Sequence, residues 1–202
     1  MQREFFELKK ELKLNDDHRV CRNFLPDPET YLRWDDVEYA LNTGKYYTDI
    51  ILDGSHLDVD VFNYFWHDHR NQDKKRLFDM INEGHTFAMT CFSQYNRKIS
   101  SLIADIEQIF AVMCDVHVYG GTGDKGSFYP HVDIPSNFIF QIEGTTKWRL
   151  YKNSACDMFM QEEINSTFDP NELEVQHEVT LEPGDMLYIP ARRFHAAFPE
   201  GR

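Results

Sequence analysis

Apolar residues recur at helical spacing along the first half of the chain, and the pattern becomes strand-like in the second half. Near the amino terminus Phe5, Leu8 and Leu12 stand three and four residues apart, which gives a predicted first helix one apolar face. Ile99, Leu102 and Ile106 repeat this spacing in a later segment. The pattern predicts helices over residues 1–14, 34–41, 70–81 and 97–112.

Short apolar or alternating runs bounded by Gly, Pro and Asp predict strands. Two of these runs are joined at Glu143-Gly144, which predicts a hairpin between them. The order of helices first and strands afterwards is typical of an α+β chain that ends in a double-stranded β-helix (jelly-roll). The strand-like runs cover residues 46–52, 86–92, 137–142, 147–151 and 181–190.

The length of 202 residues suits a single domain with a sizeable core. We expect residues 1–112 to flank a β core formed by residues 113–202. The 42% hydrophobic and 14% aromatic content also favours a sheet-rich globular protein.

The formal net charge of −13 argues against nucleic-acid binding by neutralisation of phosphates. A basic protein or peptide partner fits this charge better. The acidity is explained equally well as a property that keeps a protein dispersed in water.

The four cysteines, Cys21, Cys91, Cys114 and Cys156, form no Cys-x-x-Cys motif. We interpret them as reduced residues of a cytoplasmic protein. The amino-terminal segment is charged and amphipathic where a signal peptide would be continuously apolar, and the chain holds no run of about 18 apolar residues. Secretion and membrane insertion are therefore not expected.

The candidate chemistry centres on His131, Asp133 and His195. Side chains two apart in a strand project from the same face, so His131 and Asp133 can reach one ion. His195 follows a short apolar strand that begins after Pro183-Gly184-Asp185. Two imidazoles and one carboxylate on one face of Fe(II) leave the opposite face open for other ligands. We therefore predict a metal site formed by these three residues.

Three other motifs compete with this interpretation. His56-Leu57-Asp58 repeats the tripeptide spacing, but no strand-like runs follow it. His67-Asp68-His69 is more typical of a solvated turn than of a ligand pair. Gly120-Gly121-Thr122-Gly123 is a glycine-rich turn with no predicted helix start after it, which disfavours phosphate binding.

The segments HVDIPSNFIFQIEGTTKWRLY (131–151) and VTLEPGDMLYIPARRFHAA (179–197) resemble the Jumonji C-domain (JmjC), cupin-fold Fe(II)/2-oxoglutarate oxygenases, in particular the small protein hydroxylases and ribosomal oxygenases. The resemblance implies that His131, Asp133 and His195 hold Fe(II). It also implies that Asn137 lies near the C1 carboxylate of the co-substrate 2-oxoglutarate. The implied activity is that of a dioxygenase that hydroxylates a protein or peptide side chain.

One position departs from this family. Where members carry Lys or Arg to bind the C5 carboxylate of 2-oxoglutarate, this chain has Thr146, with Lys147 next to it. Strand parity places Thr146 and Trp148 on one face and Lys147 on the other, so Lys147 can replace the missing cation only if a bulge intervenes. Tyr119, Tyr129 and Trp148 are further candidates for the co-substrate side.

Only seven residues follow His195, whereas the family normally adds another strand. If a strand is missing, an unpaired sheet edge invites pairing with a second copy of the chain, and we expect a homodimer in that case. Two alternative functions remain at this point: a non-oxidative cupin metalloenzyme such as an isomerase, and a metal-free cupin-like binding module.

Overall fold

The computed structural model describes residues 2–12, 17–43, 48–52, 55–56, 74–89, 92–94, 96–121, 129–155 and 169–200. The predicted helices are confirmed within these ranges, with ends that differ by a few residues. Asn96 caps the longest helix by accepting a hydrogen bond from Ile99 N at 2.8 Å, and Ala111 ends it in a left-handed conformation. The helices are α1 (Gln2–Leu12), α2 (Trp34–Thr43), α3 (Lys74–Asn82) and α4 (Arg97–Phe110).

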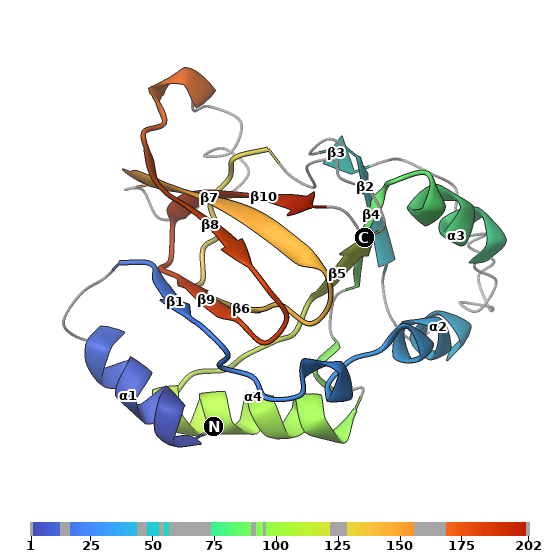
Figure 1. Ribbon diagram of the computed structural model, residues 1–202, viewed down its shortest axis with the longest axis horizontal. Helices are drawn as coiled ribbons and strands as arrows, with labels where there is room; N and C mark the ends of the chain where they lie inside the picture. Colours follow the sequence, from blue (N-terminus) through green and yellow to red (C-terminus); the bar gives the residue numbers. More distant parts are fainter. Residues whose placement is uncertain are drawn as a thin grey trace.

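Ten strands form three sheets in the described part of the chain, and every pairing is antiparallel. Two three-stranded sheets have the orders β1-β9-β6 and β10-β7-β8, and a four-stranded sheet has the order β3-β2-β4-β5 (Figure 1). The strands are β1 (Arg19–Cys21), β2 (Thr48–Leu52), β3 (Ser55–His56), β4 (Thr86–Met89), β5 (Val118–Gly121), β6 (Asn137–Phe140), β7 (Thr145–Ser154), β8 (Val175–Leu181), β9 (Met186–Ile189) and β10 (Arg193–Glu200).

The predicted hairpin at Glu143-Gly144 is wrong. β6 pairs with β9, whereas β7 pairs with β8 and β10, so the chain passes from one sheet to the other between β6 and β7. Gly144 has a φ of 65°, a value that glycine adopts readily. The glycine correctly marked a change of chain direction, but a local turn signal does not determine which strand the next run pairs with.

The two three-stranded sheets share a small apolar core. Leu150 of β7 and Leu181 of β8 are buried in one cluster with Leu187 and Ile189 of β9. Leu150 is paired with His195 on one side and with His177 on the other, so these three residues form a row across β10, β7 and β8. Leu150 therefore stands between the two histidines at the ends of this row.

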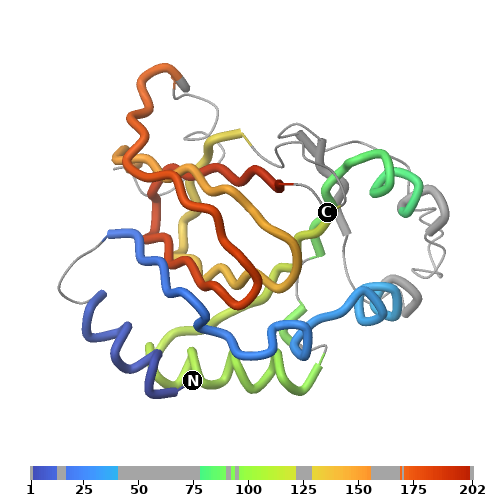
Figure 2. The backbone as a smooth tube through the Cα atoms, viewed as in Figure 1, coloured from blue at the N-terminus to red at the C-terminus, as the bar shows by residue number. Residues whose placement is uncertain are grey.

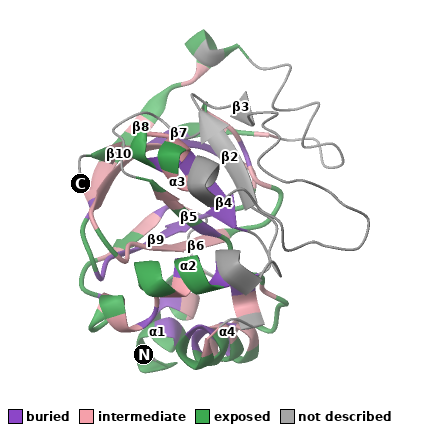
Figure 3. Cartoon of the chain, turned by 90° about the vertical axis from the view of Figure 1, so that its right-hand side faces the viewer, coloured by how far each residue is buried: buried purple, intermediate pink, exposed green. Residues whose placement is uncertain are grey.

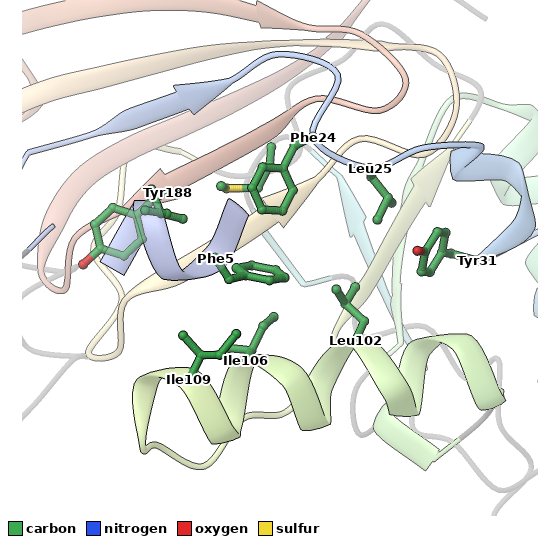
Figure 4. Packing of buried hydrophobic residues seen from close by; sticks show 10 residues of the cluster. Phe5, Phe24, Leu25, Tyr31, Leu102, Ile106, Ile109 and Tyr188 are labelled. Atoms are coloured by element: carbon green, nitrogen blue, oxygen red, sulfur yellow. The ribbon is translucent and has the colours of Figure 1, made fainter. Parts of the chain in front are cut away.

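Helices α1 and α4 lie against the outer side of the β1-β9-β6 sheet (Figure 1). Phe5 of α1 is fully buried and meets Phe24 edge to face, with ring centroids 4.9 Å apart. Leu102 and Ile106 of α4 complete this contact (Figure 4). The apolar face predicted for the first helix is thus part of the core. Every residue of β4 and of β9 is also buried (Figure 3).

Asp185 joins the turn before β9 to the residues after β1. Its carboxylate is buried and accepts hydrogen bonds from Arg22 Nη1 at 2.5 Å and from the backbone N–H groups of Asn23 and Glu182, each at 3.0 Å. These partners hold the pKa of Asp185 below its usual range, although burial alone would raise it. The turn that leads toward His195 is therefore firmly positioned.

Among the described helices, none combines the length and the apolar character needed to cross a membrane. Cys21 and Cys114 carry free thiols, and burial raises the pKa of both. Cys91 and Cys156 lie outside the described residues.

Candidate metal centre

His131 and His195 are brought together by their backbones. His131 N donates to His195 O at 3.1 Å, and His195 N donates to His131 O at 2.9 Å, as in an antiparallel bridge. The segment that contains His131 runs beside β10 before it enters β6 (Figure 2). Residues far apart in the sequence thus become direct neighbours in this sheet.

The side chains of His131, Asp133 and His195 converge on one point. Each offers a donor atom, and these atoms all lie within 4.8 Å of one another. His195 Nε2 stands 3.4 Å from Asp133 Oδ2, with the His195 side chain only 4% exposed. Within the described part of the chain, this is the only group of three such residues whose donor atoms come so close.

Both imidazoles are held in the tautomer that a metal requires. His131 Nδ1 lies 2.9 Å from the carbonyl oxygen of Tyr129, and His195 Nδ1 lies 2.9 Å from that of Arg193. A carbonyl oxygen only accepts, so each Nδ1 must carry a proton, and in the neutral ring Nε2 is the nitrogen whose lone pair can bind a metal. Backbone partners of this kind orient the histidines of metal sites and raise their basicity.

Asp133 is also fixed from two sides. Asn137 Nδ2 donates to Asp133 Oδ2 at 2.6 Å, and Arg192 N donates to Asp133 O at 2.7 Å. Burial raises the pKa of Asp133, but the His195 ring at 3.4 Å, the His131 ring and the Asn137 amide outweigh it and lower the pKa to about 2.

Burial and the neighbouring His195 lower the pKa of His131. At neutral pH His131 is therefore neutral and Asp133 is ionised, which are the protonation states that bind a metal ion without releasing a proton. Two imidazole nitrogens and one carboxylate oxygen suit Fe(II) in an open facial arrangement. The side chains of His131, Asp133 and His195 thus fit Fe(II), the metal expected from the sequence.

Of the rival motifs, the structure describes only His56, whose backbone lies in β3, and Gly120 and Gly121, which lie in β5. His67-Asp68-His69, Leu57, Asp58 and Thr122-Gly123 lie outside the described residues.

The register of β7 decides which side chains can face the metal. From Thr146 to Leu150 the pairings with both neighbouring strands run without a shift, so no bulge intervenes. Trp148 shares a face with Leu150 and packs on the core, whereas Lys147 Nζ lies 3.0 Å from Glu178 Oε2. Lys147 is thus paired with Glu178 on the other face and does not replace a cation at Thr146.

Trp148 also lies close to the metal ligands. Its ring centroid lies 6.1 Å from that of His195, and its indole Nε1 is buried without a hydrogen-bond partner. A buried donor without an acceptor is rare in a native protein and suggests that a ligand atom completes it. Tyr119 is more than half exposed on β5, with its hydroxyl 3.4 Å from His117 Nδ1.

Two positioning features could not be foreseen from the sequence. The carbonyl oxygens of Tyr129 and Arg193 orient the histidines, and a backbone acceptor leaves no signal in residue identity. Ser136 Oγ accepts from Ala191 N at 3.1 Å and lies 3.3 Å from the Tyr188 hydroxyl, which ties the loop after Asp133 to β9.

The chain is similar to a known domain family and to several known proteins. A family model described as "JmjC domain" matches residues 88–202. The bifunctional lysine-specific demethylase and histidyl-hydroxylase NO66 of Culex quinquefasciatus is 26% identical over 201 residues, which cover 96% of this chain and 29% of that protein. Ribosomal oxygenase 1 of Danio rerio is 25% identical over 169 residues, covering 81% of this chain and 28% of that protein.

Among solved structures, the ribosomal oxygenase YcfD of Escherichia coli in complex with cobalt and 2-oxoglutarate aligns with a TM-score of 0.64 at 16% sequence identity. The alignment covers 96% of this chain and 48% of that one. This likeness shows a shared fold of the cupin type. The chain spans less than a third of the length of these two curated relatives and about half of the solved structure.

Proposed function

Because this chain belongs to the JmjC domain family, we propose that it is an Fe(II)- and 2-oxoglutarate-dependent dioxygenase that hydroxylates a protein or peptide side chain. The observation that carries the proposal is the convergence of His131, Asp133 and His195, with both imidazoles oriented through Nδ1. The two three-stranded sheets would form the opposing halves of a double-stranded β-helix, with the amino-terminal helices outside it. Residues 1–202 would then act as one domain.

In this proposal the three residues hold Fe(II) through His131 Nε2, an Asp133 carboxylate oxygen and His195 Nε2. Bound there with 2-oxoglutarate, Fe(II) supplies the oxidation of a C–H bond by O₂. Asn137 would keep Asp133 in position, and the apolar core around Leu150 would exclude water from one side of the centre. The metal ligands are the residues on which catalysis depends.

The co-substrate would lie along the face of β7 that carries Thr146 and Trp148. The unpartnered indole Nε1 supports this placement, because an oxygen of a bound 2-oxo acid would satisfy it. Asn137 is close enough to the metal ligands to contribute a second donor. Tyr119 and Lys147 are weaker candidates, since their known contacts are to His117 and Glu178.

For the substrate we propose a basic segment of a protein. The net charge of −13 supports attraction of a cationic partner and disfavours nucleic acid. One relative is named as a lysine-specific demethylase and histidyl-hydroxylase, both of which act on amino-acid residues, and another as a ribosomal oxygenase. Cytoplasmic location and self-association through an unpaired sheet edge stay predictions.

The test is turnover with Fe(II), 2-oxoglutarate and a panel of basic peptides that contain histidine, arginine or lysine. We expect succinate to form and one peptide to gain the mass of one oxygen atom, with neither product in Asp133→Ala. If the protein binds iron but forms no succinate from 2-oxoglutarate, either with any peptide of the panel or without a peptide, the result would argue for a non-oxidative enzyme.

A further inference from the structure

A second group of polar side chains, Asp17, His18, Gln176 and His177, lies where the residues before β1 meet β8. His177 occupies the end of the His195–Leu150–His177 row on β8. His18 immediately precedes β1, whose first residue pairs with β9. Asp17 and Gln176 accompany these two histidines, because Gln176 Nε2 lies 3.4 Å from both carboxylate oxygens of Asp17.

His18 is the unusual member of this group. The residue is only 6% exposed, and neither of its ring nitrogens has a hydrogen-bond partner. Gln176 Oε1 is likewise buried without a partner. Leaving a buried polar atom unsatisfied costs about 1 to 3 kcal/mol, so several such atoms in one place call for a bound ion, ligand or water.

The spacing of Asp17 and His18 suits a shared ion. His18 Nδ1 lies 3.3 Å from Asp17 Oδ1, but their alignment is not that of a hydrogen bond. Two donors bound at about 2.0 to 2.2 Å to one tetrahedral Zn(II) stand roughly 3.3 to 3.6 Å apart. The same kind of contact, at 3.4 Å, joins His195 and Asp133 in the first centre. The other described His–carboxylate pairs are longer, at 3.7 Å for His117–Asp115 and 3.9 Å for His85–Glu83.

The protonation states also suit a cation. Burial is the main cause that lowers the pKa of His18 to about 4, so its ring is neutral at pH 7 and offers a lone pair. The pKa of Asp17 is lowered, since its contacts with His18 and the charge of Arg193 outweigh burial, and the carboxylate is ionised. The charge of Arg193 acts against a bound cation, and the ionised Asp17 offsets it.

We propose that Asp17, His18 and His177 form a second metal site, which takes a divalent transition-metal ion such as Zn(II) or Co(II), with Gln176 Oε1 as a further oxygen ligand. The three donor atoms do not converge as closely as those of the first centre, so the His177 side chain must rotate toward Asp17 and His18 when the ion binds. His177 is exposed at the surface of β8, where such a rotation leaves the core undisturbed. Binding is therefore weaker than at the first centre. The ion would tie the residues before β1 to β8.

The proposal is tested by titration of the full chain with Co(II), followed by calorimetry and by the visible spectrum of the bound ion. Wild-type protein should bind two equivalents of Co(II). Asp133→Ala should lose the equivalent at the first centre and keep the other. In the Asp133→Ala background, His18→Gln should abolish this equivalent. His177→Gln, at an exposed position that folding does not depend on, should weaken it by about tenfold or more through loss of one ligand.

The matched control is His117→Gln, which removes an exposed histidine beside Asp115 and should leave the second equivalent intact. Binding of a single equivalent by wild-type protein and of none by Asp133→Ala would overturn the proposal. The proposal would also be overturned if a second equivalent of Co(II) still binds to His18→Gln and His177→Gln but no longer binds when His67 and His69 are replaced. These outcomes do not depend on whether the chain uses 2-oxoglutarate.

Discussion

His131 and His195 exchange both of their backbone hydrogen bonds, at 3.1 and 2.9 Å, and their rings lie 4.5 Å apart. The metal centre is therefore built by strand pairing: the register of β10 decides which side chain faces Asp133. A slip of one residue would turn His195 to the other face of the sheet. Each imidazole is then oriented by the carbonyl oxygen two residues before it, so the chain orients both histidines without a dedicated side chain.

The first prediction concerns Asn137. Asn137→Ala removes the donor to Asp133 Oδ2 and frees the carboxylate to rotate, so Mn(II) affinity should fall by about tenfold to a hundredfold. Calorimetric titration measures this change. Ser136→Ala is the matched control, because Ser136 bonds to Ala191 and not to Asp133. Equal losses in both variants would mean that the loop, and not the Asn137 amide, positions the carboxylate.

The second prediction concerns the face of β7 toward the metal. Lys147 is paired with Glu178, so Lys147→Ala should leave 2-oxoglutarate affinity unchanged in the Mn(II)-loaded protein. Thr146→Lys adds a cation on the face of Trp148 and should tighten binding by about tenfold or more, since a charge-assisted hydrogen bond contributes roughly 1.5 to 3 kcal/mol. Loss of binding in Lys147→Ala with no effect of Thr146→Lys would mean that β7 is bulged when the co-substrate is bound.

The third prediction is a pH dependence from His18. Its pKa falls from 6.5 to about 4 on folding, so the unfolded chain binds more protons between these values. The free energy of unfolding therefore decreases as pH falls from about 6.5 toward 4, by at most about 3 kcal/mol. Urea unfolding in the presence of a chelator measures this slope. His18→Gln should flatten it relative to wild type and to His117→Gln, and equal slopes in all three proteins would remove His18 as the cause.

The fourth prediction compares two neighbouring phenylalanines. Phe5 is fully buried between α1, α4 and the β1-β9-β6 sheet, whereas Phe6 is 50% exposed. Phe5→Ala should lower the free energy of unfolding by about 3 to 5 kcal/mol, and Phe6→Ala should change it little. Thermal or urea unfolding of both variants is the measurement. Similar effects of the two changes would mean that α1 does not dock as described.

The sequence predicted the helices and the placement of His131 beside Asp133 because both depend on local signals. Helical spacing in 97–112 determines the buried face of α4, and the parity of a strand brings His131 and Asp133 to one face. The predicted hairpin failed because the pairing of β6 with β9 depends on residues some fifty positions later, which no local turn signal records. The environment of Asp17 and His18 was missed for the same reason, since Gln176, which donates to Asp17, and His177, whose charge acts on His18, belong to β8.

The most direct test of the account is anaerobic titration of the protein with Fe(II) and then with 2-oxoglutarate, followed in the visible spectrum. We predict tight binding of Fe(II) at His131, Asp133 and His195, and a weak charge-transfer band when 2-oxoglutarate is added. His131→Ala, Asp133→Ala and His195→Ala should each lose tight Fe(II) binding and the band with the fold intact, because a three-ligand site that loses one ligand loses most of its affinity. His56→Ala and Asp58→Ala should retain both. Tight Fe(II) binding without the band, or undiminished iron in His195→Ala, would contradict the account.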